Sequence, residues 1–278
     1  MFPLFLAVLS SSSNMVVMRI SQAHITSPYS MLAGNYIMCF LLSLFYLAPR
    51  PMLPQVPGLL PTAALGLFNG FLFLGGFVMV QRCTRENGVV LTSIFSRLGV
   101  LVPTVMAITL FGETPTLLQL AGIALALFAI LFMNGGKQAA PKGMLSSLLL
   151  LLLFSGGSDG MAKVYEQIGT PALADHFLLF TFFFALVYNL ILVLAAHEHF
   201  GKTELLFGLL LGVPNYFVAR FHLQAVAVLP AVIVYPTFCV GTILVTSLIG
   251  MLCFREKLSR RQIVSFFVIL LSLVCLNL

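Results

Sequence analysis

Residues 88–134 read GVVLTSIFSRLGVLVPTVMAITLFGETPTLLQLAGIALALFAILFMN. They contain two long apolar segments, 89–110 and 117–134, joined by the short polar sequence FGETPT. The first segment carries one charged residue, Arg97, far from both of its ends, and the second carries none. A helix crosses the bilayer core with about 20 apolar residues. These residues therefore predict two membrane-spanning helices connected by a tight turn.

The composition extends this prediction to the whole chain of 278 residues. Only 8% of the residues are charged and 60% are hydrophobic, whereas a soluble domain is about 25% charged. The apolar runs are unbroken rather than alternating, which excludes a β-barrel. Lipid offers the backbone no hydrogen-bond partners, so the spans must be helices. We predict an all-α integral membrane protein without a separate soluble domain.

Ten apolar segments are predicted to span the membrane. They cover residues 2–21, 30–48, 59–80, 89–110, 117–134, 144–163, 174–196, 204–222, 230–253 and 262–278. The segments between them contain Pro, Gly and polar residues that end helices. The segment between the third and fourth spans is QRCTREN, residues 81–87. Asp175, at the start of the seventh span, is expected to cap free N–H groups of that helix.

Polar landmarks recur at a constant spacing along the chain. The pairs, each separated by 143 residues (256 − 113 for the glutamates), are Pro28 and Pro171, Gly58 and Gly201, Gln81 and Gln224, Glu113 and Glu256, Gln119 and Gln262, and Asn134 and Asn277. We interpret residues 1–140 and 141–278 as two five-helix repeats of one membrane unit. Because five is odd, the second repeat must be inverted in the membrane, which is typical of transporters with a site between the repeats.

Three stretches resemble a known family. They are SSSNMVVMRI (11–20), FGETPTLLQLAGIALALFAILF (111–132) and FREKLSRRQIVSFFVILL (254–271). The pattern is similar to the drug/metabolite transporter superfamily, in its EamA-like ten-helix branch. The resemblance implies a basket of ten helices around a central cavity, with the fifth and tenth helices peripheral. Two features depart from the family pattern: the chain contains no tryptophan, and Thr114 stands where a basic residue usually follows the first junction glutamate.

The predicted spans place the protein in a membrane, but they leave its orientation across that membrane open. The first apolar run starts at Phe2 with no basic region before it, so we expect a true span rather than a signal peptide. We expect a multi-pass protein of the cell (inner) membrane. Most Lys and Arg residues of the turns fall on one side, which by the positive-inside rule places both termini outside. The family resemblance implies both termini inside.

Arg97 is the first candidate for a substrate-binding residue. It lies about eight residues into the fourth predicted span, or roughly 12 Å deep at 1.5 Å per residue. A charge within a span is costly, so its default interpretation is a functional site facing a cavity. A guanidinium group binds carboxylates and phosphates through paired hydrogen bonds. The alternative is a structural tie to backbone carbonyls or hydroxyl groups.

Asp159 is the second candidate and the acid placed deepest in a predicted span. It could bind a substrate amine or carry a coupling proton. The alternative is a helix-internal pair with Lys163, four residues further on. Arg97 and Asp159 together would match a zwitterion, or they could neutralise each other.

Uncharged polar residues within the spans form a second group of binding candidates. These are Asn14, Asn69, Asn215, Tyr216, Tyr235 and His222. Each such group more often bonds a neighbouring helix than a ligand. Glycine pairs four residues apart, Gly66/Gly70, Gly156/Gly160 and Gly208/Gly212, are interpreted as sites of close helix packing.

We expect neither a metal site, nor a disulfide framework, nor a cofactor. The five cysteines are scattered, and no phosphate-binding GxxxxGK[ST] motif is present. The chain is therefore predicted not to be an enzyme, and no nucleic-acid partner is expected.

We expect a secondary transporter, an exporter of amino acids or related carboxylate-bearing solutes, working by alternating access. The alternatives are an exporter of hydrophobic or quaternary cations and a non-transporting membrane scaffold or accessory subunit. Besides substrate and membrane lipid, the expected partner is at most a second copy, in a homodimer.

Overall fold

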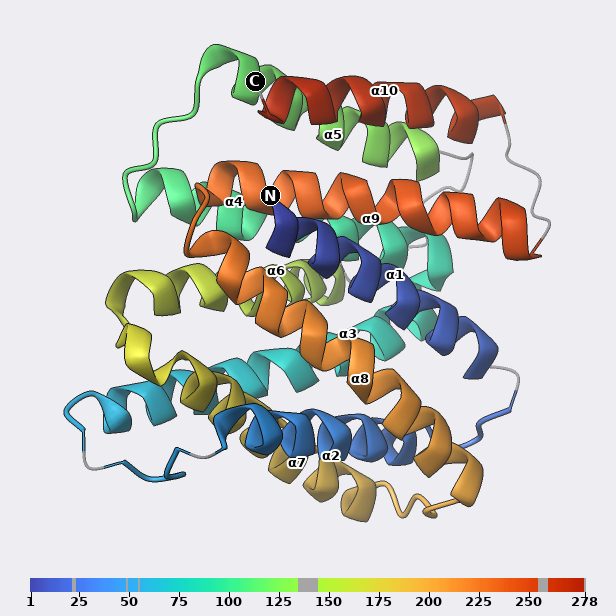
Figure 1. The fold of residues 1–278 in the computed structure, drawn as a ribbon. Helices are drawn as coiled ribbons and strands as arrows, with labels where there is room; N and C mark the ends of the chain where they lie inside the picture. The colour runs from blue at the N-terminus through green and yellow to red at the C-terminus, as the bar shows by residue number, and fades with distance from the viewer. Residues whose placement is uncertain (22–23, 49, 55, 135–144, 255–259, 278) are drawn as a thin grey trace. The chain divides into compact units, whose positions relative to one another are not determined.

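The computed structural model describes residues 1–278 except 22–23, 49, 55, 135–144, 255–259 and 278. Its elements in chain order are α1 (Phe2–Ser21), α2 (Pro28–Leu47), α3 (Leu59–Leu98), α4 (Leu101–Thr109), α5 (Leu117–Asn134), α6 (Leu145–Ile168), the short 3-10 helix η1 (Pro171–Leu173), α7 (Ala174–Ala195), α8 (Lys202–Val226), α9 (Ala231–Phe254) and α10 (Arg260–Asn277) (Figure 1). Within these described residues the chain is all-helical, as the sequence predicts.

The helices have the length and composition of membrane spans. Seven helical stretches of at least 20 residues are long and apolar enough to cross a bilayer, counted over the described part of the chain. Three shorter apolar stretches, Phe95–Thr109, Leu117–Phe132 and Ile263–Asn277, account for the other predicted spans. The chain is a multi-pass membrane protein.

The turn predicted at residues 81–87 was wrong, because this segment belongs to α3. The sequence QRCTREN contains no proline, and several of its polar side chains are satisfied within the helix. Arg82 donates to Glu86 one turn later at 2.7 Å, and Thr84 Oγ1 donates to the Val80 carbonyl. The helix ends instead at Leu98, just before Gly99 and Pro103. Proline cannot donate to the carbonyl four residues earlier, which weakens a helix at that point.

The predicted FGETPT turn is confirmed. Residues 111–116 are non-helical, and Gly112 has a φ of 67°, a conformation that costs glycine little. Immediately after this turn, the N-terminus of α5 is closed by a capping box. The Thr116 amide donates to Gln119 Oε1, and the Gln119 amide donates to Thr116 Oγ1.

The described chain forms two compact units, each built from both predicted repeats. The α2–α8 unit comprises residues 2–74 and 164–227, and the α5–α10 unit comprises residues 75–163 and 228–278 together with Met1. In the first unit α2 packs on both α7 and α8, and α1 packs on α8 (Figure 1). In the second, α5 packs beside α10, and α9 contacts α4, α5 and α10.

Glycines bring helices together within the α2–α8 unit. A Cβ atom on Gly34 of α2 would lie 3.1 Å from the Cα of Gly208 on α8. A Cβ on Gly70 of α3 would lie 2.7 Å from the Thr181 carbonyl oxygen on α7. Small residues let membrane helices approach this closely, since packing rather than the hydrophobic effect drives their association. The predicted packing role of Gly70 and Gly208 is confirmed.

A small apolar core holds α5, α9 and α10 together in the α5–α10 unit. Its buried members are Ala126, Ala129, Ile130, Val240, Ile243 and Ile269. A Cβ on Gly122 of α5 would lie 3.1 Å from the Leu276 amide nitrogen, and Ser272 Oγ on α10 donates to the Gly122 carbonyl at 2.8 Å. The α5–α10 contact thus combines apolar packing with a hydrogen bond across the helices.

Candidate functional site

Helix α9 brings Arg97 and Asp159 to the same neighbourhood of the α5–α10 unit. The Tyr235 hydroxyl on α9 donates to the backbone carbonyl of Asp159 on α6 at 3.0 Å. The Cys239 thiol, also on α9, lies 3.8 Å from the backbone carbonyl of Arg97 near the end of α3. Tyr235 and Cys239 are four residues apart, about 6 Å along a helix. The two charged positions therefore adjoin one face of α9 about one turn apart.

The two charges do not neutralise each other. Among the described residues, Arg97 and Asp159 form no ion pair with one another, although the Cys239 thiol interacts electrostatically with both. Asp159 is exposed and Arg97 is half-buried. The mutual neutralisation considered from the sequence is therefore not found.

The helix-internal pair between Asp159 and Lys163 was also wrong. The Lys163 ammonium group binds Glu113 at 3.0 Å, and both side chains are largely buried, with 7% and 15% exposed. The Glu113 carboxylate also accepts the amides of Ala231 and Val232, the first two residues of α9. Glu113 thus lies in a turn, as predicted, but it caps α9 rather than the helix that follows it.

The remaining predicted site residues lie in the α2–α8 unit, and the two asparagines Asn69 and Asn215 bond neighbouring helices. Asn69 Nδ2 donates to Thr181 Oγ1 at 3.2 Å, linking α3 to α7. Asn215 Nδ2 donates to Asn35 Oδ1 at 3.2 Å, linking α8 to α2. These contacts favour a packing role for both asparagines.

The other predicted site residues of this unit are Asn14, Tyr216 and His222, and the surroundings of their side chains differ. Asn14 is half-buried on α1, and none of the described residues donates to its side-chain oxygen. His222 is buried on α8. Tyr216 is almost fully buried, and its hydroxyl accepts a hydrogen bond from Arg220 at 2.9 Å. Tyr216 therefore supports an arginine rather than facing open space.

A charged cluster that was not predicted surrounds Asp175. Its Oδ1 accepts from Arg220 at 2.9 Å and its Oδ2 accepts from Arg50 at 3.0 Å. The expectation that Asp175 caps α7 was wrong, because the N-terminus of that helix has no side-chain cap. Two guanidinium groups from distant parts of the sequence use both carboxylate oxygens instead.

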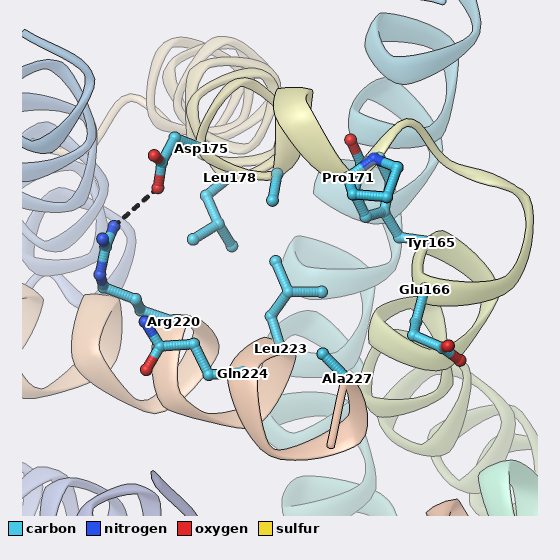
Figure 2. A pocket seen from close by; sticks show the side chains of 10 residues that line it. Tyr165, Glu166, Pro171, Asp175, Leu178, Arg220, Leu223, Gln224 and Ala227 are labelled. Atoms are coloured by element: carbon cyan, nitrogen blue, oxygen red, sulfur yellow. Dashed lines mark hydrogen bonds and ion pairs between the residues drawn. The ribbon is translucent and has the colours of Figure 1, made fainter. Parts of the chain in front are cut away.

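A cavity lies beside this cluster. Figure 2 shows it between α6, α7 and α8, with the Arg220–Asp175 ion pair on one side and Tyr165 and Glu166 across from it. Its volume is about 350 Å³, and Leu178 and Leu223 are among its apolar lining residues.

Sequence reasoning missed Cys239 and Arg220 as site residues. Each is placed on a helix four residues after a tyrosine that was predicted as a candidate. Only this spacing, from Tyr235 to Cys239 and from Tyr216 to Arg220, could have indicated them, because residues four apart share one face of a helix.

Comparison with known proteins connects these features to a family. The model of the EamA-like transporter family matches residues 1–135. The match covers slightly less than half of the chain and corresponds to the first predicted repeat. The resemblance drawn from the sequence is confirmed, and the family lies within the drug/metabolite transporter superfamily. The EamA-like family is a family of membrane transporters of small solutes.

Two further similarities cover nearly the whole chain. A protein of Haemophilus influenzae, described only as an uncharacterized protein, is 25% identical over 292 residues, covering 99% of this chain and 97% of that protein. A solved crystal structure has a TM-score of 0.79 at 10% identity and covers 99% of this chain and 94% of its own. At that identity the crystal structure supports the fold alone.

Proposed function

We propose that this EamA-like protein exports small zwitterionic solutes, amino acids or related carboxylate-bearing metabolites. Transport would proceed by alternating access between two inverted repeats, residues 1–140 and 141–278. The observation that supports this proposal most directly is that Arg97 and Asp159 lie beside one face of α9 without an ion pair between them. Opposite charges that adjoin the same helix and form no ion pair with each other are suited to a ligand that supplies both counter-ions.

The chemistry of each group fits one end of an amino acid. A guanidinium group binds a carboxylate through two parallel hydrogen bonds. A carboxylate such as that of Asp159 attracts an ammonium group, and it does so more strongly where water is excluded. An amino acid carries both groups on one carbon, so it can bridge charges that adjoin α9 about one turn apart. Tyr235 and Cys239 would then position the two binding groups through their backbone carbonyls.

The test is counterflow in liposomes loaded with an amino-acid mixture. The wild type is expected to take up labelled amino acids, and Arg97→Gln and Asp159→Asn are each expected to reduce uptake at least tenfold. Arg82→Gln is the matched control, because Arg82 is an arginine of the same helix that pairs with Glu86 near the surface. Unchanged uptake by both site variants would refute the proposed site. No uptake by the wild type would refute the amino-acid proposal and favour the scaffold alternative.

A second candidate function is export of hydrophobic or quaternary cations. It is favoured by the exposure of Asp159 and by the pairing of Lys163 with Glu113. Aromatic residues such as Tyr235 bind such cations through their ring faces. Under this alternative Asp159→Asn abolishes uptake of a labelled tetraalkylammonium ion, whereas Arg97→Gln leaves that uptake unchanged. Loss in both variants would instead support the zwitterion.

A further inference from the structure

The Asp175 cluster carries one positive charge more than its acid can neutralise. Asp175 offers two carboxylate oxygens, and Arg220 and Arg50 each take one of them. Both contacts use a single Nη1 atom of each arginine, and Arg220 Nη1 also donates to the Tyr216 hydroxyl. A guanidinium group has five N–H donors in a fixed fork. Each arginine therefore retains donors that the cluster itself does not use.

These donors border a second cavity of about 630 Å³. Arg50, Asp175 and Arg220 line it together with His176, Gln224 and several prolines and small apolar residues. The His176 ring is held by the Pro51 carbonyl at 3.0 Å. Asp175 is the one acid among its described lining residues, so two arginines give this cavity a net positive charge.

The smaller cavity of Figure 2 adjoins this one and has a different character. The two share Pro171, Ala174, Asp175, Arg220 and Gln224. The smaller cavity adds Leu178, Leu223 and Ala227, and it also contains Glu166 (Figure 2). An anion is therefore favoured on the Arg50 side, away from Glu166. Apolar space lies on the other side of the Arg220–Asp175 pair.

The cluster lies where helices of the α2–α8 unit end or begin. Arg50 follows the end of α2 at Leu47, Asp175 is the second residue of α7, and Arg220 is in the last two turns of α8. The Arg220 guanidinium stacks 4.2 Å above the centre of the Tyr46 ring. Arginine and tyrosine at helix ends are typical of the level of the lipid head groups in a membrane protein.

We propose that Arg50 and Arg220 form a binding site for the head group of an anionic phospholipid. The phosphate binds the unused guanidinium donors in the larger cavity, and an acyl chain lies along the adjoining apolar surface. Arginine matches phosphate oxygens in charge and in hydrogen-bond geometry. Basic clusters near helix ends attract anionic lipids with about 1 kcal/mol per residue, or about a fivefold change in affinity. This site shares no residue with the Arg97–Asp159 site, and the proposal does not depend on the transported solute.

The test measures lipid binding to the purified full-length protein in neutral detergent. Phosphatidylglycerol is titrated while bound lipid is counted by native mass spectrometry and the melting temperature is followed. We expect phosphatidylglycerol to bind and to raise the melting temperature, and phosphatidylcholine to do neither. Arg50→Gln should weaken phosphatidylglycerol binding about fivefold. Because the Arg50 side chain is 59% exposed, this variant should fold normally.

Control variants distinguish specific lipid binding at Arg50 and Arg220 from a general attraction of anionic lipid to basic residues. Arg82→Gln removes a similarly exposed, ion-paired arginine, and it should leave lipid binding unchanged. Equal binding of both lipids, or equal loss in Arg50→Gln and Arg82→Gln, would overturn the proposal. The same stabilisation by inorganic phosphate alone would also overturn it, because the ligand would then be a free anion rather than a lipid.

Discussion

Lys163 binds Glu113 at 3.0 Å in a largely buried ion pair, and Glu113 also accepts the first two amides of α9. One carboxylate thus joins α6, the FGETPT turn and the start of α9. Removing one partner of a buried pair leaves an uncompensated charge, which costs about 3–5 kcal/mol. This contact therefore contributes substantially to the stability of the α5–α10 unit.

We expect Lys163→Met to lower the melting temperature more than the double variant Lys163→Met/Glu113→Gln does. In the double variant neither side chain of the pair carries a charge, and the amide oxygen of the glutamine still accepts from the α9 amides. Thermal unfolding in detergent of the four members of this double-mutant cycle measures the coupling. Additive losses would show that the two side chains do not interact.

The Gly34–Gly208 crossing should tolerate no side chain. A Cβ on Gly208 would lie 2.8 Å from the Gly34 Cα and 2.9 Å from the Asn35 amide nitrogen, so backbone atoms would have to move. We expect Gly208→Val to reduce the yield of folded protein and to lower its melting temperature by several degrees. Gly76→Ala is the control, because a Cβ there meets nothing closer than 3.8 Å. Equal behaviour of the two variants would contradict this packing.

Tyr235→Phe tests whether the Tyr235 hydroxyl positions Asp159. The variant removes one hydrogen bond to the Asp159 carbonyl and leaves the ring in place. A hydrogen bond of this kind contributes about 1 kcal/mol, which corresponds to an approximately fivefold change in affinity. We expect the apparent KM for the transported solute to rise by up to about fivefold, and the melting temperature to fall by no more than a few degrees. A lower melting temperature with an unchanged KM would make the hydroxyl purely structural.

Cys239 provides a reporter for the occupied site. It is half-buried beside Arg97, whereas Cys39 and Cys83 are fully buried. In a variant that retains Cys239 but carries Cys253→Ser and Cys275→Ser, a small thiol reagent should label mainly Cys239. A transported amino acid should slow this labelling, and a non-transported one should not. Labelling that no solute slows would place the binding site elsewhere.

Much of the architecture could be predicted from the sequence because it depends on local properties. The lengths of the apolar runs, the glycine pairs and the FGETPT turn indicate the helices, their close contacts and one tight connection. The segment at 81–87 was mistaken for a turn because its run of polar and charged residues was interpreted as the end of the helix. In the structure Arg82 and Glu86 satisfy each other along the helix.

The partners of the charged residues could not be predicted, because they depend on which helices meet. Lys163 has Asp159 within reach along α6, yet it binds Glu113 from another segment. Asp175 begins α7, yet it binds Arg50 and Arg220.

Hydropathy and helix length are properties of neighbouring residues. The amino-acid sequence alone is therefore enough to establish an all-helical membrane protein with a charged residue, Arg97, inside an apolar segment. Which charges are paired, and which remain available for a ligand, became known only from the folded arrangement of the helices. The physical reason is that Coulomb interactions between side chains fall with distance in space, whatever the separation of the residues along the chain.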